Sequence, residues 1–357
     1  MTIPKTMKAL VSYGKDDYRL EMEYPTPACG DDDVIIKVEG CGVCAGDLKC
    51  QHGADMFWGG NGQPSWVQPP FIPGHEFVGL AVEIGKNVKG IRLGDRLTAD
   101  QIYPCGECRF CKSGQYWMCQ PHQIFGFFSD VCGGMAEYMR LPKKSVIHQV
   151  PKSMPLEMAL LIEPYSCSKH CVDRAQIGGE DIVVLSGAGT LGLGMVTYAL
   201  TRNPKLLIVM DMKEERLEKA KAFGADLVWN PSKVDVVAEI MKLTEGYGCD
   251  TYIEATGYPS SVTQGMAMIR KLGRFVEFSV FGEPTTLDWS IIGDRKELDV
   301  LGAHLSPYCF PFVIENIHSG KLKTNGIVSS MFELKDWEKA FESASGKFGD
   351  FKVAFQF

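Results

Sequence analysis

The pattern of apolar and polar positions divides the chain into two kinds of segment. Over residues 7–150, short runs such as "DVIIKVEGCGV" alternate between apolar and polar side chains, which predicts half-buried strands, and Gly and Pro punctuate them. Over residues 181–300, continuous apolar runs such as "DIVVLSG" are followed by helical patterns such as "LGLGMVTYALTR". Strands that alternate with helices predict βαβ units and a parallel sheet.

The pattern changes again after about residue 300, where the segments shorten and "LKDWEKAFESA" has the spacing of a helix. A chain of 357 residues is also long for one core, so two domains are the first expectation. We therefore predict an α/β protein. Residues 159–299 are expected to form a nucleotide-binding domain, inserted between residues 1–158 and 300–357 of a β-rich domain.

Composition narrows the class of protein. The chain is 45% hydrophobic and 23% charged, which is ordinary for a globular protein. Its formal charge of -7 argues against nucleic-acid binding and against binding to an anionic membrane surface. Residues 1–10 lack the apolar core of a signal peptide, and no apolar stretch is long enough to span a membrane. We expect a cytoplasmic protein, in which the 13 cysteines are thiols or metal ligands more often than disulfides.

Four cysteines in one short loop form the most specific motif: Cys105, Cys108, Cys111 and Cys119. Four thiolates suit a tetrahedral zinc ion in a closed structural site. Three other interpretations stay open from the spacing, namely reduced free thiols, an iron–sulfur cluster and a zinc-ribbon nucleic-acid module. The ribbon is disfavoured because the loop carries only two basic residues.

A second candidate metal site is dispersed along the chain. Its members are Cys44, then His75 and Glu76 in "PGHE", and finally Glu163 in "LIEPYS". Each is a weak signal alone, because a lone Cys or His is more often a buried structural residue. A Cys, a His and a carboxylate together are suitable ligands for a catalytic zinc ion with one open position.

A glycine-rich turn directly follows the apolar strand "DIVVLS" and opens a helical segment. Asp211 ends the next predicted strand, where it is suited to accept hydrogen bonds from a ribose. In this context glycines permit close approach of a pyrophosphate, and the helix N-terminus favours its negative charge. The pattern predicts a Rossmann domain that binds NAD, against the alternative of a Gly-rich turn without a cofactor. The turn consists of Gly187, Ala188, Gly189, Thr190, Leu191 and Gly192.

At these residues the chain resembles the zinc-containing medium-chain alcohol dehydrogenase family, essentially from end to end. The resemblance implies a GroES-like β-rich catalytic domain with an inserted Rossmann domain. It also implies a NAD-linked reaction in which zinc acts as a Lewis acid on a substrate hydroxyl and hydride passes to the nicotinamide. The motifs that carry it follow the family's order: "GVCAGDLK", "PGHEFVGLAVEIG", "GDRL", "CGECRFCKSGQYWMC", "GGMAEY", "LIEP", "SGAGTLGLG" and "LGAHL".

The resemblance implies two zinc ions per chain. Cys44, His75 and a carboxylate would hold the catalytic ion, and either Glu76 or Glu163 would be the direct ligand. The four cysteines of the loop match the family's structural site. Asp47 and Lys352 match positions beside the catalytic ligands. The residues implied to contact the cofactor are Gly187, Gly189, Thr190, Leu191, Gly192, Asp211, Arg216, Thr256, Gly257, Ser279 and Ala303.

Two departures from the family bear on the reaction. Gly46 and Lys49 stand where the family usually has a Ser or Thr and a His that pass a proton to solvent. Lys49, His52, Glu163 or zinc-bound water are the candidates to replace this relay. The second departure is a long segment between Cys44 and His75, which is either an ordinary packed loop or a wall of the substrate pocket. Its large apolar side chains are Met56, Phe57, Trp58, Trp66 and Phe71.

These features predict oxidation of a secondary hydroxyl of a small unphosphorylated polyol to a ketose. Glu163 is the main reason, because polyol and threonine dehydrogenases of the family have Glu where liver- and yeast-type enzymes have Cys. The pocket segments lack an Arg cluster for a phosphate, and the bulky segment 56–71 favours tetritols, such as erythritol or threitol, and pentitols over hexitols. An L-threonine 3-dehydrogenase or another secondary-alcohol dehydrogenase is the alternative activity, and a non-catalytic NAD- and zinc-binding protein is the alternative class. By analogy we expect a homo-oligomer, either a dimer or a tetramer.

Overall fold

The computed structural model describes residues 3–60 and 62–357 of the chain. Its contacts divide the chain into two compact units, Met1–Glu163 with Phe310–Phe357, and Pro164–Cys309. The domain limits expected from the sequence, at 158/159 and 299/300, stay predictions. None of the helices in the described part of the chain has both the length and the apolar surface needed to cross a membrane.

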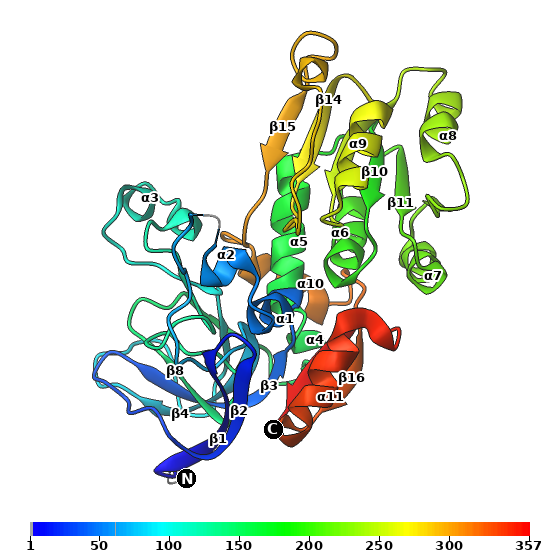
Figure 1. The fold of residues 1–357 in the computed structure, drawn as a ribbon. Coiled ribbons are helices and arrows are strands. Elements are labelled where there is room, and N and C mark those ends of the chain that lie inside the picture. The colour runs from blue at the N-terminus through cyan, green and yellow to red at the C-terminus, as the bar shows by residue number, and fades with distance from the viewer. Residues whose placement is uncertain (1–2, 61) are drawn as a thin grey trace. The chain divides into compact units, whose positions relative to one another are not determined.

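The first unit is built around a seven-stranded sheet with the strand order β16-β17-β3-β4-β5-β9, in which β8 also pairs with β3 (Figure 1). Strands β3 and β4 are antiparallel and shift register twice, which bends the sheet. The seven strands are β3 (Val34–Gly42), β4 (Glu76–Ile84), β5 (Arg96–Ala99), β8 (Tyr138–Leu141), β9 (Ile147–Gln149), β16 (Val328–Phe332) and β17 (Lys352–Gln356).

Two antiparallel strand pairs and several short helices complete this unit. The pairs are β1 (Thr6–Gly14) with β2 (Asp17–Pro25), and β6 (Ile102–Tyr103) with β7 (Gln123–Ile124). The helices are α1 (Ala45–Gln51), α2 (Asp55–Trp58), α3 (Arg109–Lys112), η1 (Tyr116–Met118), α4 (Leu156–Ala159), α10 (Phe310–His318), η3 (Leu334–Asp336), α11 (Trp337–Glu342) and η4 (Ser343–Lys347).

The second unit contains a six-stranded parallel sheet with the order β12-β11-β10-β13-β14-β15. The chain moves outward from β10 in one direction and then, from β13, in the other. This order is characteristic of dinucleotide-binding domains and confirms the predicted parallel sheet of βαβ units. The strands are β10 (Ile182–Ser186), β11 (Leu206–Met210), β12 (Leu227–Trp229), β13 (Cys249–Glu254), β14 (Ile269–Glu277) and β15 (Asp299–Gly302).

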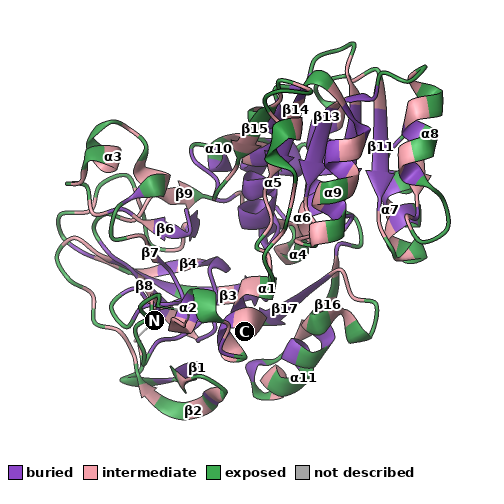
Figure 2. Cartoon of the chain, turned by 45° about the horizontal axis from the view of Figure 1, so that its top comes forward, coloured by how far each residue is buried: buried purple, intermediate pink, exposed green. Residues whose placement is uncertain are grey.

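Helices connect these strands and cover the sheet. Figure 2 shows the sheet strands β11 and β13 in the colour of buried residues, whereas helices α7 and α8 carry exposed positions on their outer faces. Side chains such as Ile208, Tyr252 and Phe275 form the core between sheet and helices. The helices are α5 (Ile162–Ala175), α6 (Thr190–Leu200), α7 (Glu214–Phe223), α8 (Val236–Leu243), α9 (Pro259–Met268) and η2 (Trp289–Ile291).

Two glutamates lie next to each other where β13 and β14 end. Glu254 and Glu277 are paired in register on these neighbouring strands. Glu254 is fully buried, and its carboxylate accepts hydrogen bonds from the amides of Thr256 at 2.8 Å and Gly257 at 3.1 Å. Burial and the charge of Glu254 raise the pKa of half-buried Glu277 to about 7. Glu277 therefore keeps its proton in the folded chain at pH values where the unfolded chain has lost it.

The substitution Glu277→Gln is expected to remove a pH dependence of stability. Because folding raises the pKa of Glu277 from 4.5 to about 7, the wild-type free energy of unfolding should fall as pH rises through this window and level off above it. Glutamine stays neutral at every pH, so the free energy of unfolding of the variant relative to wild type should increase by about 1–2 kcal/mol between about pH 5 and pH 8. This figure is smaller than the full pKa shift implies because Glu277 is partly exposed and solvent screens its charge. Denaturant unfolding at several pH values checks this. The exposed Glu283→Gln serves as the control, and a similar pH-dependent gain in that variant would remove Glu277 as the cause.

Candidate metal and cofactor sites

Cys44 lies at the start of α1, directly after β3 has ended. Its thiol accepts a hydrogen bond from the amide of Gly46 at 3.4 Å, and its own amide donates to Asp47 Oδ2 at 2.8 Å. These reciprocal bonds form a capping box, which fixes both the first turn of the helix and the direction of the thiol. Asp47 is fully buried, and burial raises its pKa even though neighbouring His75 acts to lower it.

His75 and Glu76 stand at the beginning of β4. Both side chains are buried, and Glu76 pairs with Lys352, whose ammonium also donates to the carbonyl of Val43 at 2.9 Å. Gly42 lies opposite Glu76 in the sheet, and a Cβ at this position would overlap the Glu76 carboxylate. The missing side chain of Gly42 therefore leaves room for the Glu76 carboxylate beside Cys44, and the charge of Lys352 stabilises it there.

The donor atoms of Cys44, His75 and Glu76 all lie within 4.8 Å of one another. Within the described residues, His75 Nδ1 is buried without a hydrogen-bond partner, and Asp47 Oδ1 is 3.9 Å away. Burial alone would lower the pKa of His75, but the neighbouring Cys44, Asp47 and Glu163 raise it well above its ordinary value. A soft thiolate, an imidazole and a carboxylate in one compact group fit a zinc ion.

Glu163 lies in the first turn of α5 and is not part of this three-residue group. Its side chain is 6% exposed, and its Oε1 accepts a hydrogen bond from Gln101 Nε2 at 2.5 Å. The electrostatic influence of Glu163 still reaches His75 and Lys352. Sequence reasoning singled out Glu163 but missed Gln101, which belongs to none of the recognised motifs.

Aromatic rings pack beside the histidine, and Phe127 is their common neighbour. The centroid of its ring lies 5.7 Å from the ring of His75, 5.3 Å from that of Phe57 and 5.2 Å from that of Trp66. Phe57 and Trp66 come from the long segment identified in the sequence, whereas Phe127 was not anticipated. The segment therefore packs at least in part against the surroundings of His75, and its role as a pocket wall remains a prediction.

Lys49, the sequence candidate for a proton relay, lies in the last turn of α1. Its proposed part in proton transfer stays a prediction.

The four cysteines of the loop converge, with all four sulfurs within 4.8 Å of one another. Helix α3 and the short helix η1 fold the loop around them. Backbone amides point at the sulfurs: the amide of Cys108 donates to Cys105 Sγ at 3.3 Å, and that of Cys111 donates to Cys108 Sγ at 3.5 Å. The amide of Cys105 donates in turn to Cys119 Sγ at 3.2 Å.

The charge balance of this cluster also fits a cation. Backbone amides of Cys111 and Gln120 lower the pKa of the Cys108 thiol to about 6, whereas burial raises that of Cys111 to about 12. The protein alone therefore favours the thiolate at one sulfur and the thiol at another. A divalent cation stabilises all four thiolates together, as in tetrahedral zinc sites.

The glycine turn of the second unit leaves space for a ligand. Gly189 caps α6, which begins at Thr190. A Cβ at Gly192 would overlap the carbonyl of Gly187, so this close approach requires glycine. A Cβ at Gly189 would meet only Arg216 Nη1, at 3.9 Å. The turn thus combines tight backbone packing inside with room outside, as a pyrophosphate site requires.

Asp211 follows β11, as the sequence predicted, and joins the glycine turn to the start of α7. Its Oδ2 accepts a hydrogen bond from the amide of Ala188 at 2.8 Å, and its Oδ1 accepts one from the amide of Lys213 at 2.9 Å. Arg216 Nη1 lies 3.6 Å from Asp211 Oδ2. Each carboxylate oxygen has a second lone pair, so these bonds leave acceptor capacity for a ribose.

The other residues expected near the nicotinamide follow the carboxyl ends of successive strands. Thr256 donates its hydroxyl to Glu254 after β13, and Ser279 Oγ donates to the carbonyl of Glu254 at 3.5 Å. The amide of Ala303 donates to the carbonyl of Glu277 at 2.9 Å after β15. In open parallel sheets, ligands bind at this carboxyl edge.

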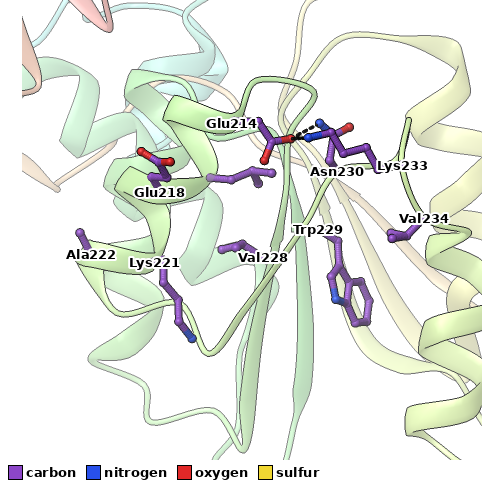
Figure 3. A pocket seen from close by; sticks show the side chains of 10 residues that line it. Glu214, Glu218, Lys221, Ala222, Val228, Trp229, Asn230, Lys233 and Val234 are labelled. Atoms are coloured by element: carbon purple, nitrogen blue, oxygen red, sulfur yellow. Dashed lines mark hydrogen bonds and ion pairs between the residues drawn. The ribbon is translucent and has the colours of Figure 1, made fainter.

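A cavity of about 560 Å³ lies elsewhere in the second unit, along α7 and the end of β12 (Figure 3). Among its lining residues, Glu214 Oε1 accepts a hydrogen bond from Asn230 Nδ2 at 2.6 Å and forms an ion pair with Lys233 Nζ at 2.8 Å. None of the predicted metal ligands or cofactor residues lines it. This cavity is therefore separate from the residues expected to hold the metal ions and the cofactor.

Comparison with known protein families agrees with this arrangement. Residues 30–152 match the alcohol dehydrogenase GroES-like domain, and residues 190–319 match the zinc-binding dehydrogenase family. The chain is 48% identical to an erythritol/L-threitol dehydrogenase of Mycolicibacterium smegmatis, over 97% of this chain and 96% of that protein. It is 35% identical to an L-threonine 3-dehydrogenase of Pyrococcus horikoshii, over 98% and 97% of the two chains.

Solved structures show the same fold. A zinc-binding dehydrogenase of Sinorhizobium meliloti 1021, solved with NADP, superimposes with a TM-score of 0.90 and 27% sequence identity, covering 99% of this chain and 100% of that one. The protein belongs to the zinc-dependent medium-chain alcohol dehydrogenase family. The predicted fold class, a GroES-like catalytic part combined with a Rossmann-type sheet, is confirmed.

Proposed function

We propose that the protein oxidises a secondary hydroxyl of a small unphosphorylated polyol to a ketose, with NAD as the hydride acceptor. The preferred substrates are tetritols such as erythritol or threitol. The observation that carries this proposal is the carboxylate of Glu163, held in a buried position by Gln101 near the Cys44 group. The similarity to an erythritol/L-threitol dehydrogenase over nearly the whole chain supports it.

Each residue of the site has a role in this proposal. Cys44 and His75 would hold a catalytic zinc ion together with Glu76, with Glu163 beside them as the alternative carboxylate ligand, and the four cysteines of the loop would hold a structural ion. Bound zinc supplies Lewis-acid polarisation of the substrate hydroxyl, and bound NAD supplies the acceptor carbon for hydride. Asp47 fixes Cys44 by accepting from its amide, and Lys352 balances the charge of Glu76.

Glu163 distinguishes a polyol from a simple alcohol in this scheme. A carboxylate accepts hydrogen bonds only, so it suits a second hydroxyl next to the one being oxidised. A vicinal diol is then anchored twice, whereas a simple alcohol leaves the buried carboxylate without that bond. Loss of such a bond is costly in a buried polar site, so analogues that lack the second hydroxyl are poor substrates.

Steady-state NAD reduction across a substrate panel tests the proposal. We expect kcat/KM for erythritol and threitol to exceed the values for hexitols, L-threonine and ethanol, with ethanol lower by about 100-fold or more. L-Threonine belongs in the panel because a threonine dehydrogenase is a relative at 35% identity. A higher kcat/KM for L-threonine or ethanol than for every polyol would contradict the role given to Glu163.

Asp211 is expected to set a preference for NAD over NADP, because its carboxylate repels a 2′-phosphate. The substitution Asp211→Asn keeps an oxygen acceptor for the amide of Ala188 but removes the charge. We predict that the ratio of kcat/KM for NADP to that for NAD rises by about 10- to 100-fold. The exposed Glu218→Gln on α7 is the charge-matched control. An unchanged ratio in Asp211→Asn would assign cofactor choice to other residues.

Two further expectations from the sequence belong to this proposal. The protein acts in the cytoplasm, and it assembles as a homodimer or homotetramer. Size-exclusion chromatography with light scattering measures the second of these directly.

A further inference from the structure

Gln101 connects the end of β5 to the first turn of α5, where Glu163 lies. It follows β5, and its side chain is only 2% exposed. Its amide donates to Glu163 Oε1 at 2.5 Å, inside the protein. Because a carboxylate has no hydrogen to donate, the nitrogen of the Gln101 amide must face Glu163. This contact fixes one oxygen of the only residue on which the proposed polyol preference rests.

The backbone around Gln101 is held on both sides. The carbonyl of Gln101 accepts a hydrogen bond from the amide of Phe125 at 2.9 Å, and the amide of Asp100 donates to the carbonyl of Val146 at 3.0 Å. Strand β6 begins at the next residue and pairs with β7. The side-chain amide therefore starts from an anchored main chain and has little freedom to move away from Glu163.

Asp100, the residue before Gln101, is clamped by two side chains. The hydroxyl of Tyr116 donates to Asp100 Oδ2 at 2.5 Å, and His148 Nε2 lies 2.7 Å from Asp100 Oδ1. Asp100 is 2% exposed, and the ring of His148 stacks on Phe310 with centroids 4.9 Å apart. The buried carboxylate is satisfied on both oxygens, as a buried charge requires.

Tyr116 belongs to the four-cysteine loop. It lies in η1, between Cys111 and Cys119. The four-cysteine loop therefore contacts Asp100, the neighbour of Gln101, through the hydroxyl of Tyr116. Two side-chain hydrogen bonds and the peptide bond between Asp100 and Gln101 connect the loop to Glu163. The path runs from Tyr116 through Asp100 and Gln101 to Glu163.

We propose that Gln101 is a positioning residue for Glu163, and that the four-cysteine loop supports this position through Tyr116 and Asp100. The inference rests on the proposed function, because it gives Glu163 a part in the metal and substrate site. The loop then has a second task besides adding stability. It steadies the carboxylate beside the Cys44 group.

The first test uses release of zinc from the holoenzyme into a chromogenic chelator. The phase that belongs to the Cys44 site is the one missing from Cys44→Ser. Gln101→Met removes the amide but keeps an unbranched side chain of similar length, and it should speed this phase by about 10- to 100-fold, the usual effect of losing a partner of a metal-site residue. Gln101→Asn keeps an amide that is too short to reach Glu163, and it should behave like Gln101→Met.

A double-mutant cycle separates positioning from general destabilisation. If Gln101 acts through Glu163, Gln101→Met should change zinc release little when Glu163 is already Gln. Equal acceleration in the presence and absence of the Glu163 carboxylate would overturn the proposal. So would unchanged zinc release in both Gln101 variants, provided that they fold as judged by thermal unfolding.

The second test addresses the loop. Tyr116→Phe removes only the hydroxyl that reaches Asp100, and it should accelerate release from the Cys44 site by about 3- to 10-fold in the same direction as Gln101→Met. Tyr103→Phe removes a hydroxyl from neighbouring strand β6, outside the path, and should leave the rate unchanged. Equal rates for Tyr116→Phe and wild type would overturn the link between loop and carboxylate.

These outcomes are distinct from a failure of the proposed function. If the wild-type protein released zinc from the four-cysteine loop alone, or reduced NAD with no polyol, the function itself would be wrong. If wild type showed both phases of zinc release and oxidised polyols, but the Gln101 variants released zinc and oxidised polyols at the same rates, only the positioning role of Gln101 would be wrong.

Discussion

Replacing Cys44 with Ser is expected to abolish polyol oxidation while leaving the fold in place. The variant loses the one thiolate of the three-residue group, and a catalytic zinc ion contributes several kcal/mol to the reaction, so kcat/KM should fall by at least about 1,000-fold. Serine is a favoured helix N-cap, so its hydroxyl replaces the thiol as acceptor for the amide of Gly46 and α1 should persist. Zinc content measured by elemental analysis should fall from two ions per chain to one.

The control for this variant is Cys29→Ser, which changes a partly buried cysteine outside both clusters. It should retain both ions, wild-type turnover and an unchanged thermal midpoint. Turnover of Cys44→Ser within tenfold of wild type would remove Cys44 from the metal site. A single zinc ion in wild-type protein would contradict the assignment of two sites.

The parallel sheet was predictable from the sequence because each of its signals is local. The apolar run of β10, the glycine turn and the helical spacing of α6 stand next to one another in the chain, and Gly224 marks the end of α7. Their order already predicts a βαβ unit. Tertiary contacts then refine the details without changing the pattern.

Details of the β-rich unit were less accessible because they depend on partners far away in the sequence. The register of β3 against β4 shifts between Ile35 and Ile36 and again between Val38 and Gly40, and no residue pattern announces such bulges. Near the C-terminus, one predicted helix becomes the succession η3, α11 and η4. Gly346, two residues beyond the segment "LKDWEKAFESA", has a φ of 82° and interrupts the regular helical conformation inside η4.

The candidate site shows the same division between local and distant information. The sequence singled out the four-cysteine loop, and Cys44 and His75 with either Glu76 or Glu163, because these residue types in that order suit a metal; the structure brings Cys44, His75 and Glu76 together. Gln101 and Phe127 escaped notice because neither residue type indicates chemistry by itself. Folding brings Gln101 to Glu163 across 62 residues of chain, and only the structure reveals that contact.

Replacing Cys108 with Ser is expected to lower stability strongly, whereas Cys44→Ser acts mainly on turnover. Cys108 Sγ accepts amide bonds from Cys111 at 3.5 Å and Gln120 at 3.4 Å, which lower the pKa of its thiol to about 6 and make it a ready thiolate ligand. Serine is a much weaker zinc ligand at neutral pH, so the structural ion should dissociate. Structural zinc contributes about 10 kcal/mol or more to folding in small zinc domains. In this larger chain we expect a loss of about 3–5 kcal/mol and a thermal midpoint lower by about 5–10 °C.

Alkylation with iodoacetamide, read by mass spectrometry, provides a second measurement for Cys108→Ser. In wild type, bound zinc should protect the four loop cysteines from alkylation even though the Cys108 thiol is only partly buried and has a pKa lowered to about 6. In the variant, Cys105, Cys111 and Cys119 should all lose this protection, because each depends on the same ion, and Cys111 should react more slowly than Cys105 because burial raises its pKa to about 12 whereas backbone amides lower that of Cys105. The Cys29→Ser control should keep the loop protected. Retention of two zinc ions and of the wild-type thermal midpoint in Cys108→Ser would contradict a structural zinc site, and a visible iron–sulfur absorbance in wild type would replace zinc with a cluster in this loop.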